Sequence, residues 1–462
     1  MKMYHFLMSL SAFGPPRSMM AAFLLLCIII SGCTHGPQPG YIVDLSEIPQ
    51  DPICFAQAST QEETVSDWAV NENIASKYLT KYFLPWKTNS SMYPKDRLYW
   101  GLDAFGDKDL YAADGLPYPG TWFRSVQANA DYHGFPSLHR NGLTVQTTHV
   151  RVLPTQEPVF YNPDQAGQGY PFDMMQNSVL WTNTPVRIVH RSRDKAWFLV
   201  QTAWVFGWVR AQDVAWVSPE QKERIEKTPL LAVTTDRLSL VDNDTRFYSI
   251  AHIGTLIAMQ GQSRHGYQVQ IPARDAHGRL SLQTGFIPRK YARPFPLALG
   301  VENIATLAGE MMGQIYGWGG LYARRDCSAS TRDLFTPFGL WLPRNSSQQA
   351  RAGQTIDLSG LTAAEKEKAI LSQGIPFFSL LWKPGHIMLY IGRHNGRPVI
   401  WHTMWGVKTK RILAGEGRHV VGRTVITSLR PGAKVRTLAR PEGLLVNSLE
   451  KMILLGPNIY RE

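Results

Sequence analysis

A strand pattern that recurs in the middle of the chain restricts the fold more than any other feature. Its first copy holds short runs of β-branched and aromatic residues, among them Pro185–His190 and Ala196–Gln201, and closes on Phe206-Gly-Trp-Val209. The second copy carries Tyr267–Ile271 and closes on Gly285-Phe-Ile-Pro288. Short strands that end on glycine and an aromatic residue predict small antiparallel β domains, because glycine permits a tight bend and the aromatic ring fills one end.

This ending is similar to that of SH3-like barrels. We therefore expect two SH3-like β-barrels of the bacterial type, over residues 127–217 and 218–296. A chain of 462 residues is too long for one hydrophobic core, so further domains must accompany them. Residues 51–126 mix a helix around Glu72–Tyr82 with aromatic loops and predict a small mixed N-terminal domain that braces the others.

The C-terminal part, residues 297–462, has an α+β order. Apolar residues spaced three and four apart from Ile304 to Ile315 predict an amphipathic helix, and a second short helix is expected from Cys327 to Leu334. Strands at His386–Ile391 and Val399–Met404 follow, with a Gly- and Pro-bearing turn between them.

The N-terminus predicts export. Basic residues precede the apolar run Met19–Ile30, which is too short to span a bilayer comfortably, and small residues follow it. The string Ile30-Ser-Gly-Cys33 also resembles a bacterial lipobox, so we expect residues 1–33 to be a lipoprotein signal and Cys33 to carry lipid. An ordinary signal peptide with an incidental cysteine is the alternative, and translation starting at Met19 or Met20 leaves either interpretation intact.

Residues 34–50 are polar and predict a tether between the lipid and the first domain. The expected location is thus the bacterial cell envelope, in the periplasm and lipid-anchored at the outer membrane. After cleavage only Cys33, Cys54 and Cys327 remain, too few for a disulfide framework, and we expect Cys54 and Cys327 to be free thiols.

The formal charge of +12 implies attraction to polyanions, although a solvated basic surface explains it equally. No dense Lys/Arg run and no nucleic-acid-binding signature occur, so no nucleic-acid partner is expected. The chain also lacks a His-Glu-x-x-His motif and paired Cys spacing, so neither a metal nor another cofactor is expected. We expect a monomer.

Candidate catalytic residues cluster in the C-terminal part. Asp326-Cys327-Ser328 follows Tyr316-Gly-Trp-Gly-Gly320, with the cysteine at the start of a helix, where the dipole and unpaired N–H groups would lower its thiol pKa. His386 opens a strand, and His402 on the next strand could hydrogen-bond to it and determine its tautomer. A thiol, a base and an orienting group suit nucleophilic catalysis.

These motifs resemble the NlpC/P60 peptidases, whose α+β fold is a circularly permuted relative of papain. The resemblance implies Cys327 as nucleophile, His386 as general base and His402 as the orienting third member. It also implies peptidoglycan stem peptides as substrate, cleaved between γ-D-glutamate and a diamino acid, with a preference for a free N-terminal L-alanine. Upstream, Arg151–Thr155 and Phe83–Trp86 resemble the SH3-like and N-terminal domains of one exported branch.

The resemblance further implies that Tyr316, Asp326 and Ser328 line the substrate pocket, with Ser346 as another member. Asp326 is the candidate partner of a substrate amine, or alternatively a helix N-cap. Asn345 stands where the family usually carries an acid or a threonine, which weakens any charge role there. The loop Tyr170–Phe172 either walls one end of the pocket through Phe172 or packs in a core.

Arg324 and Arg325 are unusual for the family and either recognise a substrate carboxylate or are solvated. Two other classes of function stay open. A catalytically silent protein could bind peptidoglycan through its SH3-like modules, and the same catalytic residues could perform acyl transfer or amide hydrolysis on another substrate.

Overall fold

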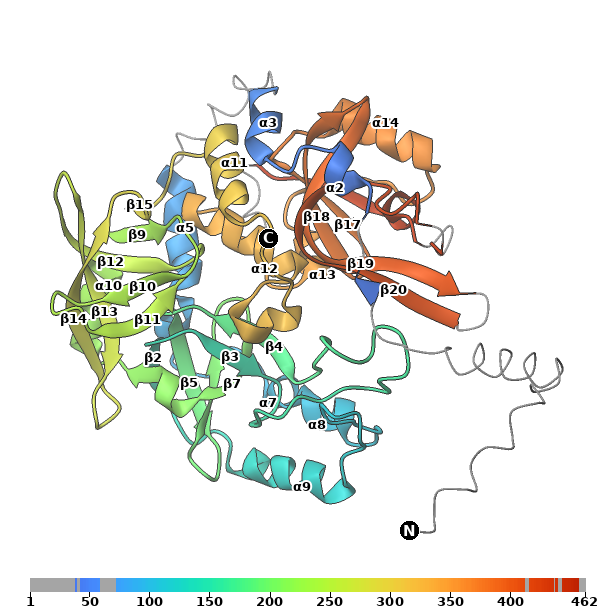
Figure 1. The fold of residues 1–462 in the computed structure, drawn as a ribbon. Coiled ribbons are helices and arrows are strands. Elements are labelled where there is room, and N and C mark those ends of the chain that lie inside the picture. Colours follow the sequence, from blue (N-terminus) through green and yellow to red (C-terminus); the bar gives the residue numbers. More distant parts are fainter. Residues whose placement is uncertain are drawn as a thin grey trace, which may run out of the picture.

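The computed structural model describes residues 38–39, 42–58, 72–411, 415–435, 437–438 and 443–456. Figure 1 shows three β-rich regions, with short helices of the N-terminal part lying against them. Cys33, the rest of the predicted signal and residues 34–37, 40 and 41 of the predicted tether lie outside the described residues. No helix within the described ranges is long and apolar enough to cross a membrane.

The N-terminal helices divide between two places. The helices are α2 (Asp44–Glu47), α3 (Pro52–Gln57), α5 (Glu72–Tyr82), α6 (Leu84–Lys87), α7 (Lys95–Leu98), α8 (Trp100–Phe105) and α9 (Gly120–Asn129). Phe55 of α3 belongs to the core of the C-terminal region, whereas Tyr82 and Trp86 pack among side chains of both upstream β regions. Figure 1 shows α2 and α3 beside the C-terminal strands and α7 to α9 beside and below the first β region. The helix predicted at Glu72–Tyr82 is confirmed.

The first β region is one seven-stranded sheet in the order β4-β3-β7-β6-β5-β2-β8. Its strands are β2 (Arg140–Thr144), β3 (Thr148–Arg151), β4 (Gln176–Leu180), β5 (Pro185–Arg191), β6 (Trp197–Gln201), β7 (Phe206–Arg210) and β8 (Val214–Trp216). Trp208 of the Gly-Trp-Val ending is fully buried, as the sequence pattern requires. A long loop between β3 and β4 carries Tyr170–Phe172 toward the C-terminal region.

Helix α10 (Pro219–Lys227) begins at a capping box formed by Ser218 and Gln221 and leads into the second β region. There a five-stranded sheet has the order β14-β13-β12-β9-β15, and β10 and β11 pair separately. The strands are β9 (Leu230–Val233), β10 (Leu238–Val241), β11 (Phe247–Ala251), β12 (Leu256–Gln262), β13 (Gly266–Arg274), β14 (Leu280–Pro288) and β15 (Ala292–Pro294). The described strands of both regions form open sheets, so neither closes into the barrel that the sequence pattern predicts.

The C-terminal region packs four helices on a second seven-stranded sheet. The helices are α11 (Val301–Glu310), α12 (Cys327–Phe335), α13 (Ser346–Gln349) and α14 (Ala363–Gln373). The sheet order is β1-β20-β19-β18-β17-β21-β16, from β1 (Gln38–Pro39), β16 (Gln354–Asp357), β17 (Ser379–Lys383), β18 (His386–His394), β19 (Arg397–Arg411), β20 (Gly415–Ser428) and β21 (Lys451–Leu454). Its core joins Ile304, Leu334 and Leu389, so α11 and α12 lie on the face of the central strands.

The predicted fold class is confirmed as a multidomain chain with a small N-terminal region, an SH3-like β-rich region and a C-terminal α+β region. The strands predicted at His386–Ile391 and Val399–Met404 are β18 and β19, and both extend beyond the predicted limits. The amphipathic helix α11 ends at Glu310, one turn before the predicted Ile315. The exact domain boundaries stay a prediction.

Candidate active site

Cys327 is the first residue of α12 and its side chain is buried, with 8% of the residue exposed. Asp326 is the N-cap, and its Oδ1 accepts a hydrogen bond of 2.9 Å from the backbone N–H of Ala329. The backbone N–H of Ile387, the residue after His386, also donates toward the Cys327 thiol. The beginning of α12 therefore meets the beginning of β18.

Burial raises the pKa of the Cys327 thiol to about 12, and the negative charge of Asp326 acts in the same direction. The Ile387 N–H, the Arg344 charge and the Ser328 N–H favour the thiolate but do not outweigh burial. The sequence-based expectation of a lowered thiol pKa is therefore wrong for the resting site, because desolvation exceeds the effect of the helix terminus. The thiol is neutral until a base removes its proton.

His386 and His402 form the hydrogen bond that their strand positions predict. His386 Nε2 lies 2.8 Å from His402 Nδ1, and β18 and β19 are adjacent antiparallel strands. Burial lowers the pKa of His386 to about 3, and the positive charge of Lys383 contributes in the same direction. Burial, followed by the proximity of His386, also lowers the pKa of His402 well below its usual value. Both imidazoles are therefore neutral near pH 7.

The tautomers of both histidines follow from Thr427 on β20. The hydroxyl of Thr427 lies 2.8 Å from the carbonyl of Ser428 and 3.0 Å from His402 Nε2, and with its proton on the carbonyl it accepts a hydrogen bond from His402 Nε2. His402 then carries its proton on Nε2 and accepts at Nδ1. His386 therefore donates from Nε2, which leaves the lone pair of its Nδ1 available to accept a proton.

Asp326 is engaged on both carboxylate oxygens. Arg344 donates to Oδ1 at 3.1 Å and to Oδ2 at 2.7 Å, Ser328 Oγ donates to Oδ1, and the Gly319 N–H donates to Oδ2. Burial alone would raise the pKa of Asp326, but the charge and hydrogen bonds of Arg344 outweigh it and lower this pKa. The alternative role of Asp326 as a helix N-cap is therefore observed, and its carboxylate has an internal cation as partner.

Two of the three other predicted pocket residues in the C-terminal region interact with the Asp326–Arg344 pair. Tyr316 is buried, and burial together with the charges of Asp326 and Cys327 raises its pKa well above the usual value. Ser328 is buried and accepts a hydrogen bond of 3.0 Å from Arg344. Ser346 begins α13 and is half-buried, with no side-chain contact to the thiol among those recorded for the described residues.

Phe172 connects the first β region to this site. Its ring centroid lies 5.1 Å from that of Trp318 and 6.1 Å from that of Trp405, and the Tyr316 ring is 5.8 Å from Trp405 on another side. Tyr170 also contacts Trp405, at 6.3 Å. The loop thus packs against the C-terminal region beside Tyr316, so its contacts serve an interface between the two regions.

Arg325 is neither solvated nor available to a substrate. It is 3% exposed and its guanidinium binds Asp333 at 2.7 Å and Asp236 at 2.6 Å. Asp236 belongs to the second β region, so this arginine joins that region to α12. Arg324 is partly exposed and lies over the Tyr322 ring.

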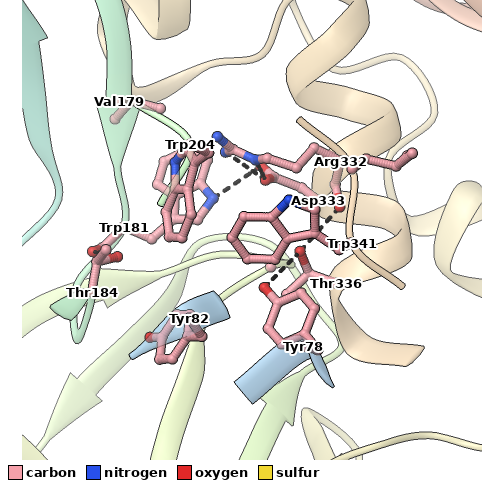
Figure 2. A pocket seen from close by; sticks show the side chains of 12 residues that line it. Tyr78, Tyr82, Val179, Trp181, Thr184, Trp204, Arg332, Asp333, Thr336 and Trp341 are labelled. Carbon is pink, nitrogen blue, oxygen red and sulfur yellow. Dashed lines mark hydrogen bonds and ion pairs between the residues drawn. The ribbon is translucent and has the colours of Figure 1, made fainter. Parts of the chain in front are cut away.

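Arg332 and Asp333, near the C-terminal end of α12, lie in a pocket lined by aromatic side chains. Figure 2 shows Arg332 and Asp333 of α12 facing Trp181 and Trp204 of the first β region, with Tyr78 of α5 nearby. The Trp181 Nε1–H donates to Asp333 at 2.9 Å, and the Tyr78 hydroxyl donates to Thr336 at 3.4 Å. The helix that carries Cys327 is therefore positioned by two other parts of the chain.

Gly319 and Gly320 explain why the motif before Asp326 needs two glycines. Both have positive φ angles, 57° and 89°, which side chains disfavour. A Cβ on Gly319 would lie 2.3 Å from the Gln176 carbonyl oxygen, and one on Gly320 would lie 2.6 Å from Val179 Cβ. The glycines thus let β4 approach the segment that precedes Cys327.

Sequence analysis missed Thr427, Asp333 and the pairing role of Arg344. Thr427 lies in a strand with no motif around it, and only the pairing of β19 with β20 brings it next to His402. Arg344 is far from Asp326 in sequence and shows no spacing signal. Asp333 could have been found from the sequence, because it lies in the same predicted helix as Cys327.

Together, a buried thiol at a helix start, a hydrogen-bonded histidine pair on the adjoining sheet and an upstream SH3-like β region define a multidomain protein of the papain-like α+β class. Three family models match the chain. They are the N-terminal NLPC_P60 stabilising domain over residues 19–135, an SH3 domain of the SH3b1 type over 158–210 and the NlpC/P60 family over 313–403. The C-terminal region thus carries a domain that matches the NlpC/P60 family.

Two solved structures are similar to this chain to different degrees. An NlpC/P60 endopeptidase from Photobacterium damselae subsp. piscicida is 25% identical, with a TM-score of 0.79, over 91% of this chain and 100% of its own. An NlpC/P60 family protein from Bacillus cereus ATCC 10987 is 13% identical, with a TM-score of 0.48, over 69% of this chain and 100% of its own. No curated protein matches the sequence.

Proposed function

We propose that this protein is a cysteine endopeptidase that cleaves the bond between γ-D-glutamate and a diamino acid in the peptide stems of bacterial peptidoglycan. The observation that carries the proposal is that the start of α12, at Cys327, contacts the start of β18, where His386 is hydrogen-bonded to His402. Similarity over nearly the whole chain to a protein described as an NlpC/P60 endopeptidase supports the reaction class. The bond itself comes from the family resemblance.

The proposed reaction starts from a neutral thiol and a neutral imidazole. The unprotonated Nδ1 of His386 takes the thiol proton of Cys327 while sulfur attacks the γ-carbonyl carbon of D-glutamate, forming a carbon–sulfur bond and an oxyanion. Transfer during attack suits the raised thiol pKa and the lowered His386 pKa, because neither group is charged beforehand. Backbone N–H groups at the start of α12 stabilise the oxyanion.

His386 then gives its proton to the amine of the diamino acid, and the carbon–nitrogen bond breaks. A water molecule next loses one proton to His386 Nδ1 and attacks the thioester, and His386 returns that proton to the Cys327 sulfur as the D-glutamate γ-carboxyl leaves. His402 stays neutral throughout. It holds the His386 ring in place through the 2.8 Å hydrogen bond and is itself held by Thr427.

We assign substrate contacts to Tyr316, Ser328, Ser346 and Phe172 by proximity to this centre or by the resemblance. A preference for a free N-terminal L-alanine, also implied by the resemblance, would rest on Asp326. Binding an ammonium there would require Arg344 to leave a carboxylate that it holds with two hydrogen bonds. Asp326 therefore contributes to the proposed site mainly by positioning α12.

Cleavage of defined substrates tests the proposal. The chain starting after Cys33 is incubated with purified stem peptides and with intact wall sacculi, and the products are analysed by mass spectrometry. We expect products cut after γ-D-glutamate, and Cys327→Ala should abolish them. Cys54→Ala is the matched control, because Cys54 is a free but exposed thiol on α3. Tight sacculus binding without cleavage in every form would contradict the proposal and favour a silent wall-binding protein.

We also propose that the protein acts in the cell envelope, anchored at the outer membrane by lipid on Cys33. The support is the apolar run followed by Ile30-Ser-Gly-Cys33, which resembles a lipobox. Labelled palmitate should enter the wild-type protein in cells and should not enter Cys33→Ala. Equal labelling of both forms would contradict the lipid anchor and leave the catalytic proposal untouched.

A further inference from the structure

A groove of about 520 Å³ lies beside the candidate active site. Its walls come from three parts of the chain: residues 93–100 around α7 and α8, residues 203–206 before and in β7, and residues 341–348 up to and in α13. This volume is within the range of ordinary ligand sites. None of the residues that line the groove takes part in a step of the proposed reaction. Arg344 is linked to the reaction centre through its contacts with Asp326 and Ser328.

Arg344 connects the groove to the nucleophile. It lines the groove, and its guanidinium binds Asp326 Oδ2 at 2.7 Å and Ser328 Oγ at 3.0 Å. Asp326 and Ser328 are the two neighbours of Cys327 in the chain. A molecule in the groove is therefore separated from the residues that flank the thiol by one arginine side chain, which suits the part of a substrate next to the cleaved peptide.

The charges around the groove disfavour an ammonium group. Among the described residues that line it, two are arginines, Arg97 and Arg344, and none is Asp or Glu. The carboxylate of Asp326, behind Arg344, is already occupied by that arginine. A free N-terminal amine would thus meet positive charge without a counter-ion, whereas a neutral amide or an anionic group would not.

The lining of the groove has the chemistry of a sugar site. Trp100 is 38% exposed, and the Tyr93 and Phe206 rings lie beside each other with centroids 4.6 Å apart. Such rings can pack against the C–H faces of pyranoses. Asn345 and Gln348 add amides for which no side-chain hydrogen bond is recorded in the described structure, and amides pair well with hydroxyl and acetamido groups.

From these observations we infer that the groove binds the amino-sugar part of peptidoglycan, so that the substrate is a stem still attached to its glycan. In such a stem the L-alanine nitrogen is a neutral amide to the sugar's lactyl group, which removes the ammonium that the groove disfavours. The inference rests on the proposed function and deepens it. It replaces the expected free L-alanine terminus with an acylated one.

Two substrates with the same stem test the inference: the free tripeptide and the disaccharide-linked tripeptide. We expect the wild type to prefer the disaccharide form by about tenfold or more in kcat/KM. Trp100→Ala should lower kcat/KM for that form by about tenfold and leave the free tripeptide within about twofold. Phe247→Ala is the control, because Phe247 is an exposed aromatic residue of the second β region outside the groove lining.

A second variant tests the charge argument without removing packing. Asn345→Asp places a carboxylate on an exposed side chain at the groove and should raise kcat/KM for the free tripeptide relative to the disaccharide form. Equal or better cleavage of the free tripeptide by the wild type, or equal losses on both substrates in Trp100→Ala, would overturn the inference.

Binding separates this inference from the proposed function. Cys327→Ala protein should bind the disaccharide-linked tripeptide more tightly than the free one by calorimetry, and Trp100→Ala in that background should remove the difference. This result would support the groove even if no form cleaved either substrate, an outcome that would contradict only the peptidase. Cleavage without a binding difference would overturn the groove and leave the peptidase standing.

Discussion

His402 Nε2 lies 3.0 Å from Thr427 Oγ1, and the hydroxyl proton of Thr427 is directed to a backbone carbonyl. This relationship determines which nitrogen of His402 carries its proton and, through the 2.8 Å bond to His386, which nitrogen of His386 is free. Thr427 on β20 thus orients His386 on β18 through His402 on β19.

Thr427→Val should therefore lower kcat by about 10- to 100-fold with little change in KM, because the His402 tautomer is no longer determined. Valine has nearly the shape of threonine, so the buried strand should keep its packing. The measurement is the pH profile of kcat and KM on a stem peptide. Thr427→Ser should restore most of the activity, and a Thr427→Val enzyme with wild-type kcat at every pH would contradict the proposed relay.

Acid should destabilise the folded protein through His386. Its pKa is about 3 in the fold, below the ordinary value of 6.5, so the neutral imidazole is favoured by folding. The resulting stabilisation is present above about pH 6.5 and is lost as the pH falls toward 3, because the unfolded chain binds the proton first. Denaturant unfolding from pH 7 to 4 measures this slope, and His386→Gln should have a shallower one.

Arg344→Ala should lower the free energy of unfolding of the protein. It leaves the buried carboxylate of Asp326 without its cation, a change that typically costs about 3–5 kcal/mol. Chemical denaturation measures the loss in free energy of unfolding. Lys227→Ala is the control, because its ion pair with Glu223 is exposed and its removal should leave no measurable change. Equal effects of the two substitutions would refute the importance of the buried pair.

Gly319→Ala should reduce both stability and activity. Its φ angle is 57° and an added Cβ would lie 2.3 Å from a backbone oxygen, so strand β4 would have to move away from the segment before Cys327. We expect a loss of about 2–4 kcal/mol in thermal or denaturant unfolding. Gly309→Ala in α11 meets no atom within 4 Å and should instead stabilise by about 0.5–1 kcal/mol.

Local sequence patterns predicted the helix and the two strands that carry the candidate catalytic residues. The start of α12 at Cys327, the strand that opens at His386 and the neighbouring strand with His402 all follow from periodicity and turn residues, and the structure confirms these elements. The His386–His402 hydrogen bond is confirmed for the same reason, since adjacent strands of a hairpin bring their side chains together. The catalytic roles of these residues stay a prediction.

Properties that depend on distant contacts were not predictable in this way. The lowered thiol pKa expected for Cys327 fails because burial by other elements outweighs the helix start. Arg325 reads as a surface cation but is buried between Asp333 and Asp236, two residues from different regions of the chain. The predicted barrels follow a correct strand pattern, yet strand pairing within the described regions leaves open sheets.

The amino-acid sequence by itself therefore determined the order of helices and strands, the family motifs and the residues able to perform nucleophilic chemistry, since these depend on neighbours along the chain. Only the tertiary structure decided the protonation states of the candidate catalytic side chains and which residues surround them. Burial of Cys327, saturation of Asp326 by Arg344 and orientation of His402 by Thr427 each depend on side chains that are distant in sequence and meet only when the regions pack.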